Sequence, residues 1–250
     1  MSGNEAWEPL HNELARWQEA GRTAVFWWRD DDAFEPTVAL DTLLDLANRY
    51  EVPVTLAVVP AKAGQPLARR LAGERHAAVA VHGWAHHNHA SESEKKQELG
   101  HHRLAEAVLG ELYHGFLHLK QLHEASFVPM LVPPWNRIDP LLIPKLSALG
   151  FENLSTYGPA AEEEPIGILN THVDIIDWHG TRGGRPDEEL IAELVAELQS
   201  RFESSDEPIG LLTHHLDHDV QAWGFCERLF KATAGNKAVA WKPAAALMKA

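Results

Sequence analysis

The sequence has one cysteine, Cys226, so no disulfide can form within the chain. It contains no apolar run of the ~18 residues that a membrane-spanning helix needs. Its N-terminal segment carries acidic residues where a signal peptide would be basic and then apolar, so we expect a cytoplasmic protein. Basic residues are also few: 22 Lys and Arg against 36 Asp and Glu give a net charge of −14. Nucleic acid and membrane are therefore not expected partners, because both are themselves negatively charged.

The composition is that of a globular protein, with 45% hydrophobic and 23% charged residues, which excludes a disordered chain. Strand-like and helix-like segments alternate along it. The strand-like segments are 24–28, 52–60, 77–83, 127–135, 151–156, 168–178 and 208–214, and the helix-like segments include 36–50, 66–73, 93–124, 139–150 and 186–202. Strands that are apolar on both faces and separated by helices predict a parallel sheet covered by helices. About seven such units without a break in composition indicate one α/β barrel-like domain, with an open doubly wound sheet as the alternative.

Polar clusters lie at the carboxyl ends of five predicted strands. They are Asp30-Asp31-Asp32, His82 with His86, Pro134-Trp135-Asn136, Asp174 with Asp177-Trp178, and His214-His215. The carboxyl ends of the strands form the active-site face of a parallel α/β barrel. We therefore expect side chains that are far apart in the sequence to meet at one site.

Two of these clusters have the residue types that bind metal ions. His82 and His86 are four residues apart, so within one helical turn or a tight loop both imidazoles can reach one ion. Three consecutive carboxylates repel one another unless a cation or a proton compensates them. Two histidines and one carboxylate with an open coordination position are typical of catalytic zinc. The alternatives are a helix N-cap for the aspartates and a His-rich surface for the histidines.

Two further clusters offer groups for catalysis. His214 or His215, at the end of a strand, can act as a general acid, and the alternative is a capping or surface histidine. Trp135 follows two prolines and can form an apolar wall that stacks on a sugar, whereas its alternative is a core tryptophan.

In order and spacing, the five clusters resemble the motifs of the polysaccharide deacetylases, the NodB-homology family also called carbohydrate esterase family four. RDDDA resembles the TFDDG motif, HGWAH the HSxxH motif, LVPPWNR the RxPYxW motif, DIIDW the DxxDW motif and LLTH the LxxH motif, over residues 24–215. The resemblance implies a distorted (β/α)7-type barrel as a single domain over 1–250. It also implies a metal-dependent hydrolase that deacetylates an N-acetylated sugar or carbohydrate derivative. The alternatives are a non-catalytic carbohydrate-binding relative and a hydrolase of a different small amide on the same scaffold.

The resemblance also implies a role for each matching residue. The general base is Asp31, the general acid His214, the metal ligands Asp32, His82 and His86, the oxyanion-hole residue Trp135, and the supporting pocket residues Asp177 and Trp178. The implied ion is Zn²⁺, with Co²⁺, Ni²⁺ or Mn²⁺ as alternatives. The implied substrate is a small molecule or an oligosaccharide, and the oligomeric state stays open.

The sequence departs from these motifs at four positions. Asp30 adds a third aspartate, which leaves the identities of base and ligand open by one position, and Ala33 and Gly83 replace a glycine and a hydroxyl residue. Val132 stands where the family has an arginine that orients the base. Arg137 and Arg29 are the candidates to replace it. The lost arginine and hydroxyl favour the non-catalytic alternative slightly, whereas the Asp-His-His set argues against it.

Overall fold

The computed structural model describes residues 5–160, 165–204 and 206–248. Within them, nine strands form one sheet in the order β6-β5-β4-β3-β2-β1-β8-β7, and β9 pairs with β1. Every pairing between these strands is parallel. The strands are β1 (Ala24–Ala33), β2 (Val54–Val58), β3 (Ala77–His82), β4 (Phe127–Val132), β5 (Asn153–Leu154), β6 (Gly167–Ile168), β7 (Val173–Asp174), β8 (Ile209–Thr213) and β9 (Val239–Trp241).

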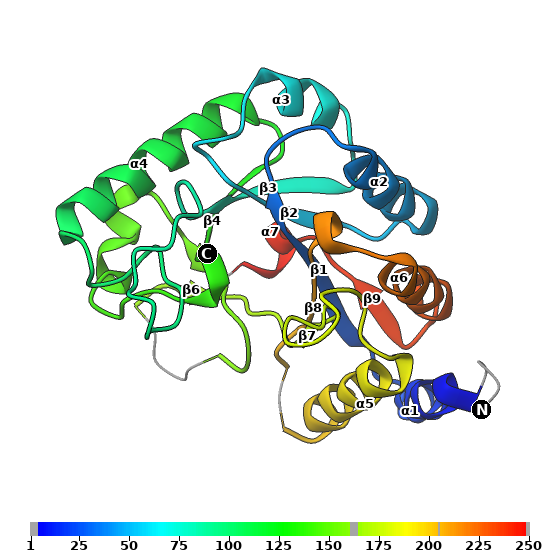
Figure 1. The fold of residues 1–250 in the computed structure, drawn as a ribbon. Coiled ribbons are helices and arrows are strands. Elements are labelled where there is room, and N and C mark those ends of the chain that lie inside the picture. The colour runs from blue at the N-terminus through cyan, green and yellow to red at the C-terminus, as the bar shows by residue number, and fades with distance from the viewer. Residues whose placement is uncertain (1–4, 161–164, 205, 249–250) are drawn as a thin grey trace.

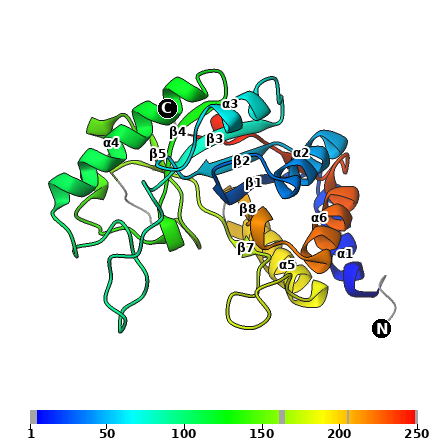
Figure 2. The same cartoon turned by 45° about the horizontal axis from the view of Figure 1, so that its top comes forward.

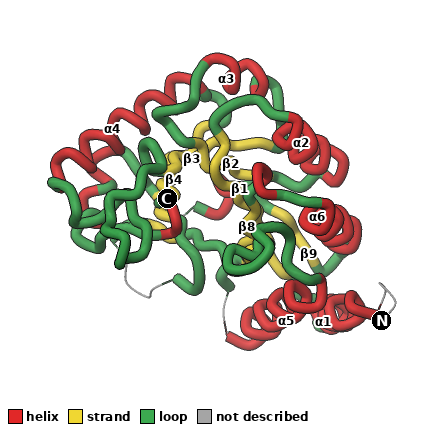
Figure 3. Tube along the Cα trace, in the orientation of Figure 1, coloured by secondary structure: helices red, strands yellow, loops and turns green. Residues whose placement is uncertain are grey.

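The sheet curls into a half-barrel, and the helices alternate with its strands. They are α1 (Glu8–Glu19), α2 (Val38–Tyr50), α3 (Gln65–Leu71), α4 (Ala105–Leu122), α5 (Asp187–Ser204), α6 (Val220–Thr233) and α7 (Ala244–Leu247). Figures 1 and 3 show α1 to α6 around the outside of the strands, and the tilted view in Figure 2 shows the same arrangement. The strands β6 and β7 stand at the two ends of the sheet. The curled parallel sheet with alternating helices confirms the distorted-barrel prediction and excludes the open doubly wound sheet.

No helix among the described residues is long and apolar enough to span a membrane.

Side-chain alternation along β1 divides the core into two clusters. Phe26 and Trp28 belong to the large cluster between the sheet and the outer helices. Trp27 belongs to a smaller cluster with residues of β2, β3 and β4, which fills the inside of the barrel. Ala244 of α7 packs into this inner cluster, so the C-terminal segment packs on the barrel itself.

The ends of the helices follow from local chemistry. Thr37 caps α2 by accepting a hydrogen bond from Leu40 N at 3.0 Å, and Glu51 ends the helix in a left-handed conformation with φ 54°. Three acidic residues occupy the first turn of α5, where they complement the positive end of the helix dipole.

Three sequence-based interpretations of local structure are wrong. The predicted helix 139–150 forms two short 3-10 helices, Ile143–Lys145 and Ser147–Leu149, because Pro144 has no N–H to donate. The predicted helix 93–124 begins only at Ala105. The predicted strand 168–178 is divided between β6 and β7, because the Asn170 side chain accepts from Thr156 N and donates to Gly158 O across the gap.

The aspartates 30–32 also lie elsewhere than expected. They were predicted to follow the first strand, but β1 continues through them to Ala33. The pairing of β1 with β2 shifts register between Asp30 and Ala33. This irregularity lets three consecutive carboxylates take different surroundings.

Candidate active site

The three aspartates of β1 point to different surroundings. Asp30 lies on the same face as Trp28 and is fully buried. Its Oδ2 accepts hydrogen bonds from Thr213 Oγ1 at 2.6 Å and from His215 N at 3.0 Å, and its Oδ1 lies 2.5 Å from His215 Nδ1. Burial lowers the pKa of His215, but the Asp30 carboxylate outweighs it and the net direction is upward. The structure therefore places Asp30 and His215 together as a brace between β1 and β8, outside the lining of the cavity described below.

Asp32 meets the two histidines that were predicted to bind metal. Its Oδ1 lies 3.2 Å from His82 Nε2 and 3.2 Å from His86 Nε2. The positive φ of Asp32, 72°, turns this residue out of the regular strand alternation. His82 Nδ1 lies 3.0 Å from Val132 O, and this contact fixes the ring so that Nε2 faces Asp32.

The electrostatics of this cluster suit a cation. Burial raises the pKa of Asp32, but the imidazoles of His82 and His86 outweigh it and hold the pKa well below its usual range. For His82, burial lowers the pKa, and Asp32 and Asp31 raise it by more. Burial and the neighbouring His82 lower the pKa of His86. The three ligand atoms lie within 4.8 Å of one another, so these residues fit a divalent metal ion.

A buried carboxylate that the sequence did not reveal holds the loop between the two histidines. Glu98 is 1% exposed and accepts hydrogen bonds from the backbone N–H groups of Trp84 (3.0 Å), Ala85 (2.9 Å) and His87 (3.2 Å). Gly83 has φ +55°, and a Cβ there would overlap the Glu98 carboxylate and the Pro134 ring. The glycine in place of a hydroxyl residue thus makes room for Glu98, which organises the loop.

Asp31 is bound by an arginine from its own strand. Arg29 is fully buried; its Nε lies 2.9 Å from Asp31 Oδ1, and its Nη2 donates to Oδ2 at 3.1 Å. Arg29 also donates to Asn136 Oδ1 at 2.7 Å and to Ser155 Oγ at 2.7 Å. Because residues two apart on a strand share a face, this guanidinium approaches Asp31 with both nitrogens. Of the two arginines considered from the sequence, Arg29 is the one that binds Asp31.

Arg137 and Val132 have different surroundings. Arg137 Nη1 donates to Lys96 O at 2.8 Å, and the residue lines the cavity. Val132 is fully buried in the apolar cluster inside the barrel.

His214 also approaches Asp31, with Nε2 3.9 Å from Asp31 Oδ2. The Trp178 ring packs edge-on against the His214 ring, with centroids 4.6 Å apart and an angle of 82°. The Trp178 indole donates to Asp174 Oδ2 at 2.8 Å, and burial raises the pKa of Asp174. Together these contacts fix the histidine beside the carboxylate.

Asp177, like Asp30 and His215, is a predicted site residue that the structure places outside this group. Its carboxylate accepts hydrogen bonds from Gly180 N at 2.9 Å and Thr181 N at 3.0 Å, and so holds a turn. Asp174, at the start of the same DIIDW segment, lines the cavity instead. The sequence carried a signal for it, because a half-buried indole needs an acceptor and Asp174 is four residues before Trp178.

Trp135 lies beside the histidine cluster. Its ring centroid is 4.3 Å from that of His86, at an angle of 55°. Trp135 and Asn136 both have φ 56°, which non-glycine residues seldom adopt and which occurs preferentially at functional sites. The turn after Pro134 therefore brings both the indole and the Asn136 amide to the site.

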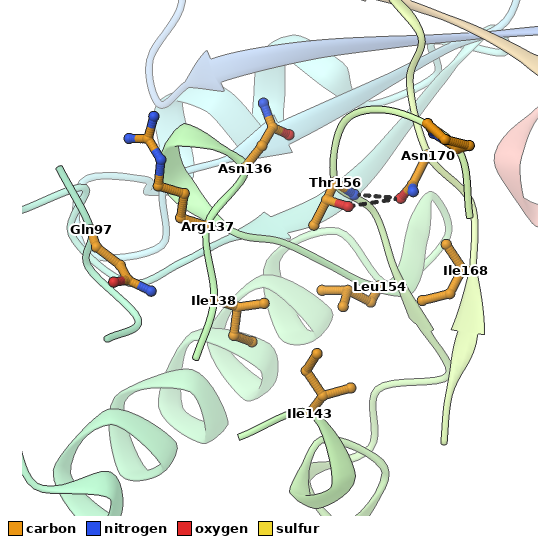
Figure 4. Close-up of a pocket in the computed structure, with 10 residues that line it drawn as sticks. Gln97, Asn136, Arg137, Ile138, Ile143, Leu154, Thr156, Ile168 and Asn170 are labelled. Atoms are coloured by element: carbon orange, nitrogen blue, oxygen red, sulfur yellow. Dashed lines mark hydrogen bonds between the residues drawn. The ribbon is translucent and has the colours of Figure 1, made fainter. Parts of the chain in front are cut away.

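These groups surround one cavity of about 1000 Å³. Its lining includes Asp31, Asp32, His82, His86, Trp135, Asp174, Trp178 and His214, together with Lys96, Arg137 and Arg182. A second cavity of about 400 Å³ shares Asn136 and Arg137 with it. Figure 4 shows this second cavity, where Ile138, Ile143, Leu154 and Ile168 provide aliphatic surface and Asn170 accepts from Thr156.

No protein-family model and no curated protein matches the sequence. Several solved structures match its fold. A Mycobacterium smegmatis structure described as that of a polysaccharide deacetylase has TM-score 0.67 and 16% identity, over 91% of this chain and 90% of that one. A family 4 carbohydrate esterase of Streptomyces lividans, in complex with acetate, has TM-score 0.54 and 15% identity, over 86% and 90%. A family 4 acetyl xylan esterase of Clostridium thermocellum, in complex with a cobalt ion, has TM-score 0.53 and 13% identity, over 89% of both chains. At the level of the fold, these matches confirm the predicted resemblance.

Proposed function

We propose, from the fold that this chain shares with those deacetylases and esterases, that it is a metal-dependent hydrolase. Its substrate class is the amide of an N-acetylated sugar or carbohydrate derivative. One observation carries the proposal: a cluster of two histidines and a carboxylate opens into the same cavity as a second carboxylate held between Arg29 and His214. A second carboxylate beside a metal-binding cluster is the arrangement that general-base catalysis needs.

The metal-binding residues in this proposal are Asp32, His82 and His86. Zn²⁺ suits two imidazoles and one carboxylate, and Co²⁺, Ni²⁺ or Mn²⁺ can occupy the same kind of donor set. A divalent cation there would polarise the amide carbonyl and make water a stronger acid.

The remaining residues supply proton transfer and positioning. Asp31 accepts the proton of the attacking water, and Arg29 holds the carboxylate toward the cavity. His214, beside Asp31, donates a proton to the leaving nitrogen. The Trp135 backbone N–H stabilises negative charge on the carbonyl oxygen, and the Trp178 ring keeps His214 in place.

Two successive measurements, metal content and then turnover, test the proposal. Wild-type protein purified without chelator should hold about one equivalent of metal, and the His82→Ala/His86→Ala variant should lose it. The wild type should then release acetate from members of a panel of N-acetyl sugars, and Asp31→Asn should keep its metal but lose turnover. Two results would overturn the proposal: no metal uptake when Zn²⁺ or Co²⁺ is added, or full turnover in Asp31→Asn. Metal-independent saccharide binding without turnover would establish the non-catalytic alternative instead.

A further inference from the structure

We infer that the substrate carries an anionic group, a carboxylate or a phosphate, near its scissile amide. This inference rests on the proposed amide hydrolysis at the same site. Lys96, Arg137 and Arg182 all line the larger cavity, although the chain as a whole has a net charge of −14. These three cations share the lining with four aspartates, Asp31, Asp32, Asp174 and Asp217.

These three cations are not used in ion pairs. No carboxylate among the described residues lies within 4.0 Å of any of them, whereas Arg70, Arg103, Arg185 and Arg201 each pair with acidic residues elsewhere on the fold. In a chain with 36 acidic residues, arginines without a carboxylate partner at the mouth of a cavity are available to a ligand.

Two of the cations sit over the two tryptophans of the site. Lys96 Nζ is 6.0 Å from the centroid of Trp135, the ring that packs on His86. Arg182 Cζ is 5.6 Å from the centroid of Trp178, the ring that packs on His214. The aromatic faces hold the cations in position while their N–H groups stay free for an anion. The Lys96 and Arg182 charges are therefore each separated from a site histidine, His86 or His214, by a single tryptophan ring.

Arg137 contacts Lys96 and lies between the two cavities. Its hydrogen bond to Lys96 O ties the two basic residues together, and it lines both the larger and the smaller cavity. A guanidinium presents a planar fork of donors that matches a carboxylate or a phosphate. An anionic substituent reaching from the amide toward the smaller cavity would meet this fork.

None of the four aspartates of the described lining lies within 4.0 Å of Lys96, Arg137 or Arg182, and three of them have other partners. Asp31 is bound by Arg29, Asp32 lies between two imidazoles, and Asp174 accepts from the Trp178 indole. Asp217 is the remaining acidic residue of the described lining. Stacking and neutral hydrogen bonds are enough to bind an uncharged sugar, so three basic residues indicate a charged one.

The test compares one N-acetyl sugar without and with an anionic substituent. The substrates are N-acetylglucosamine, its 1-phosphate, and N-acetylmuramic acid, which carries a carboxylate. We expect wild-type kcat/KM to be at least about tenfold higher for an anionic member, and the preference to shrink as salt screens the charges. Arg137→Gln and Arg182→Gln should each reduce this preference about threefold, the range of an exposed ion pair. Arg69→Gln, an exposed arginine of α3, is the matched control for net charge. The two anionic arms show whether the site prefers phosphate or carboxylate.

Calorimetric titration of metal-free protein with the same three compounds separates this inference from the proposed hydrolysis. Tighter binding of an anionic compound than of the neutral sugar, weakened in Arg137→Gln and Arg182→Gln but not in Arg69→Gln, supports the inference even if no amide is cleaved. Equal binding of all three compounds, or equal kcat/KM, overturns it whether or not the protein is a hydrolase.

Discussion

Replacing Arg29 with methionine tests the arrangement around Asp31 most directly. The side chain is fully buried and binds Asp31 through two nitrogens, and it also donates to Asn136 and Ser155. Arg29→Met removes all of these contacts and leaves an uncompensated carboxylate in the barrel. Breaking a buried ion pair from one side costs about 3–5 kcal/mol. For a chain of this length, that corresponds to a fall in Tm of roughly 10 °C.

A double-mutant cycle shows whether the cost comes from the stranded charge. Asp31→Asn in the Arg29→Met background removes that charge, so the double variant should recover part of the lost stability, with a coupling of about 2 kcal/mol. Arg137→Met is the matched control, because Arg137 was the other candidate for this role and binds only a backbone oxygen. It should change the free energy of unfolding by less than about 0.5 kcal/mol. Urea unfolding followed by tryptophan fluorescence measures wild type, the single variants Arg29→Met and Asp31→Asn, the double variant and Arg137→Met.

Arg29→Lys separates charge from geometry. Lysine keeps a positive charge but cannot present two nitrogens to one carboxylate, so it should restore part of the stability. If Asp31 must be held in one orientation, kcat should still fall about 100-fold. The reasoning fails if Arg29→Met unfolds within about 1 kcal/mol of wild type, or if Arg137→Met is the more damaging change.

Other predictions follow from buried groups near the site. Glu98→Gln should weaken metal affinity about tenfold, because the loop between the histidines loses a charged acceptor; competition with a chelator measures this, and Glu106→Gln on the exposed face of α4 should have no effect. Burial lowers the pKa of His218 from 6.5 to about 4, so its stabilising contribution is complete above pH 6.5 and is lost as the pH falls toward 4. Urea unfolding at pH 7 and pH 4.5 measures this loss of stability, which should be smaller by up to about 3 kcal/mol in His218→Leu. An unchanged pH dependence in the variant would contradict the prediction. Burial raises the pKa of the Cys226 thiol, so a thiol reagent should react with it only after unfolding, and fast labelling of the native protein would show that the thiol is accessible.

That the site residues lie together was predictable, because their meeting depends on the topology of the sheet. Parallel strands all end at the same edge of the sheet, so residues at five strand ends could be expected to meet without knowledge of any side-chain contact. Asp32, His82, His86, Trp135, Trp178 and His214 do line one cavity. Asp177 does not, because the loop after β7 turns at that residue and directs its carboxylate to its own backbone.

Features that depend on tertiary contacts were not predictable in this way. Residues 93–104 have a helix-forming composition, but the structure draws Glu98 inward to satisfy three backbone N–H groups of the histidine loop. A buried charge with three donors outweighs the small helix propensities of the neighbouring residues. Similarly, the positive φ of Asp32 decides which aspartate meets the histidines, and no pattern in the sequence encodes that angle.

The missing motif arginine shows that the same interaction can be made by a residue at a different position of the sequence. Val132 belongs to the apolar inside of the barrel, and Trp27, Arg29 and Asp31 share the inward face of β1. A guanidinium can therefore reach the Asp31 carboxylate from β1 as well as from β4, provided that it lies on this face. Asn136 and Ser155, from segments that follow β4 and β5, then accept the other donors of Arg29 and fix its plane. Loss of the arginine at position 132 thus removes a residue from a motif without removing the interaction that the proposed chemistry requires.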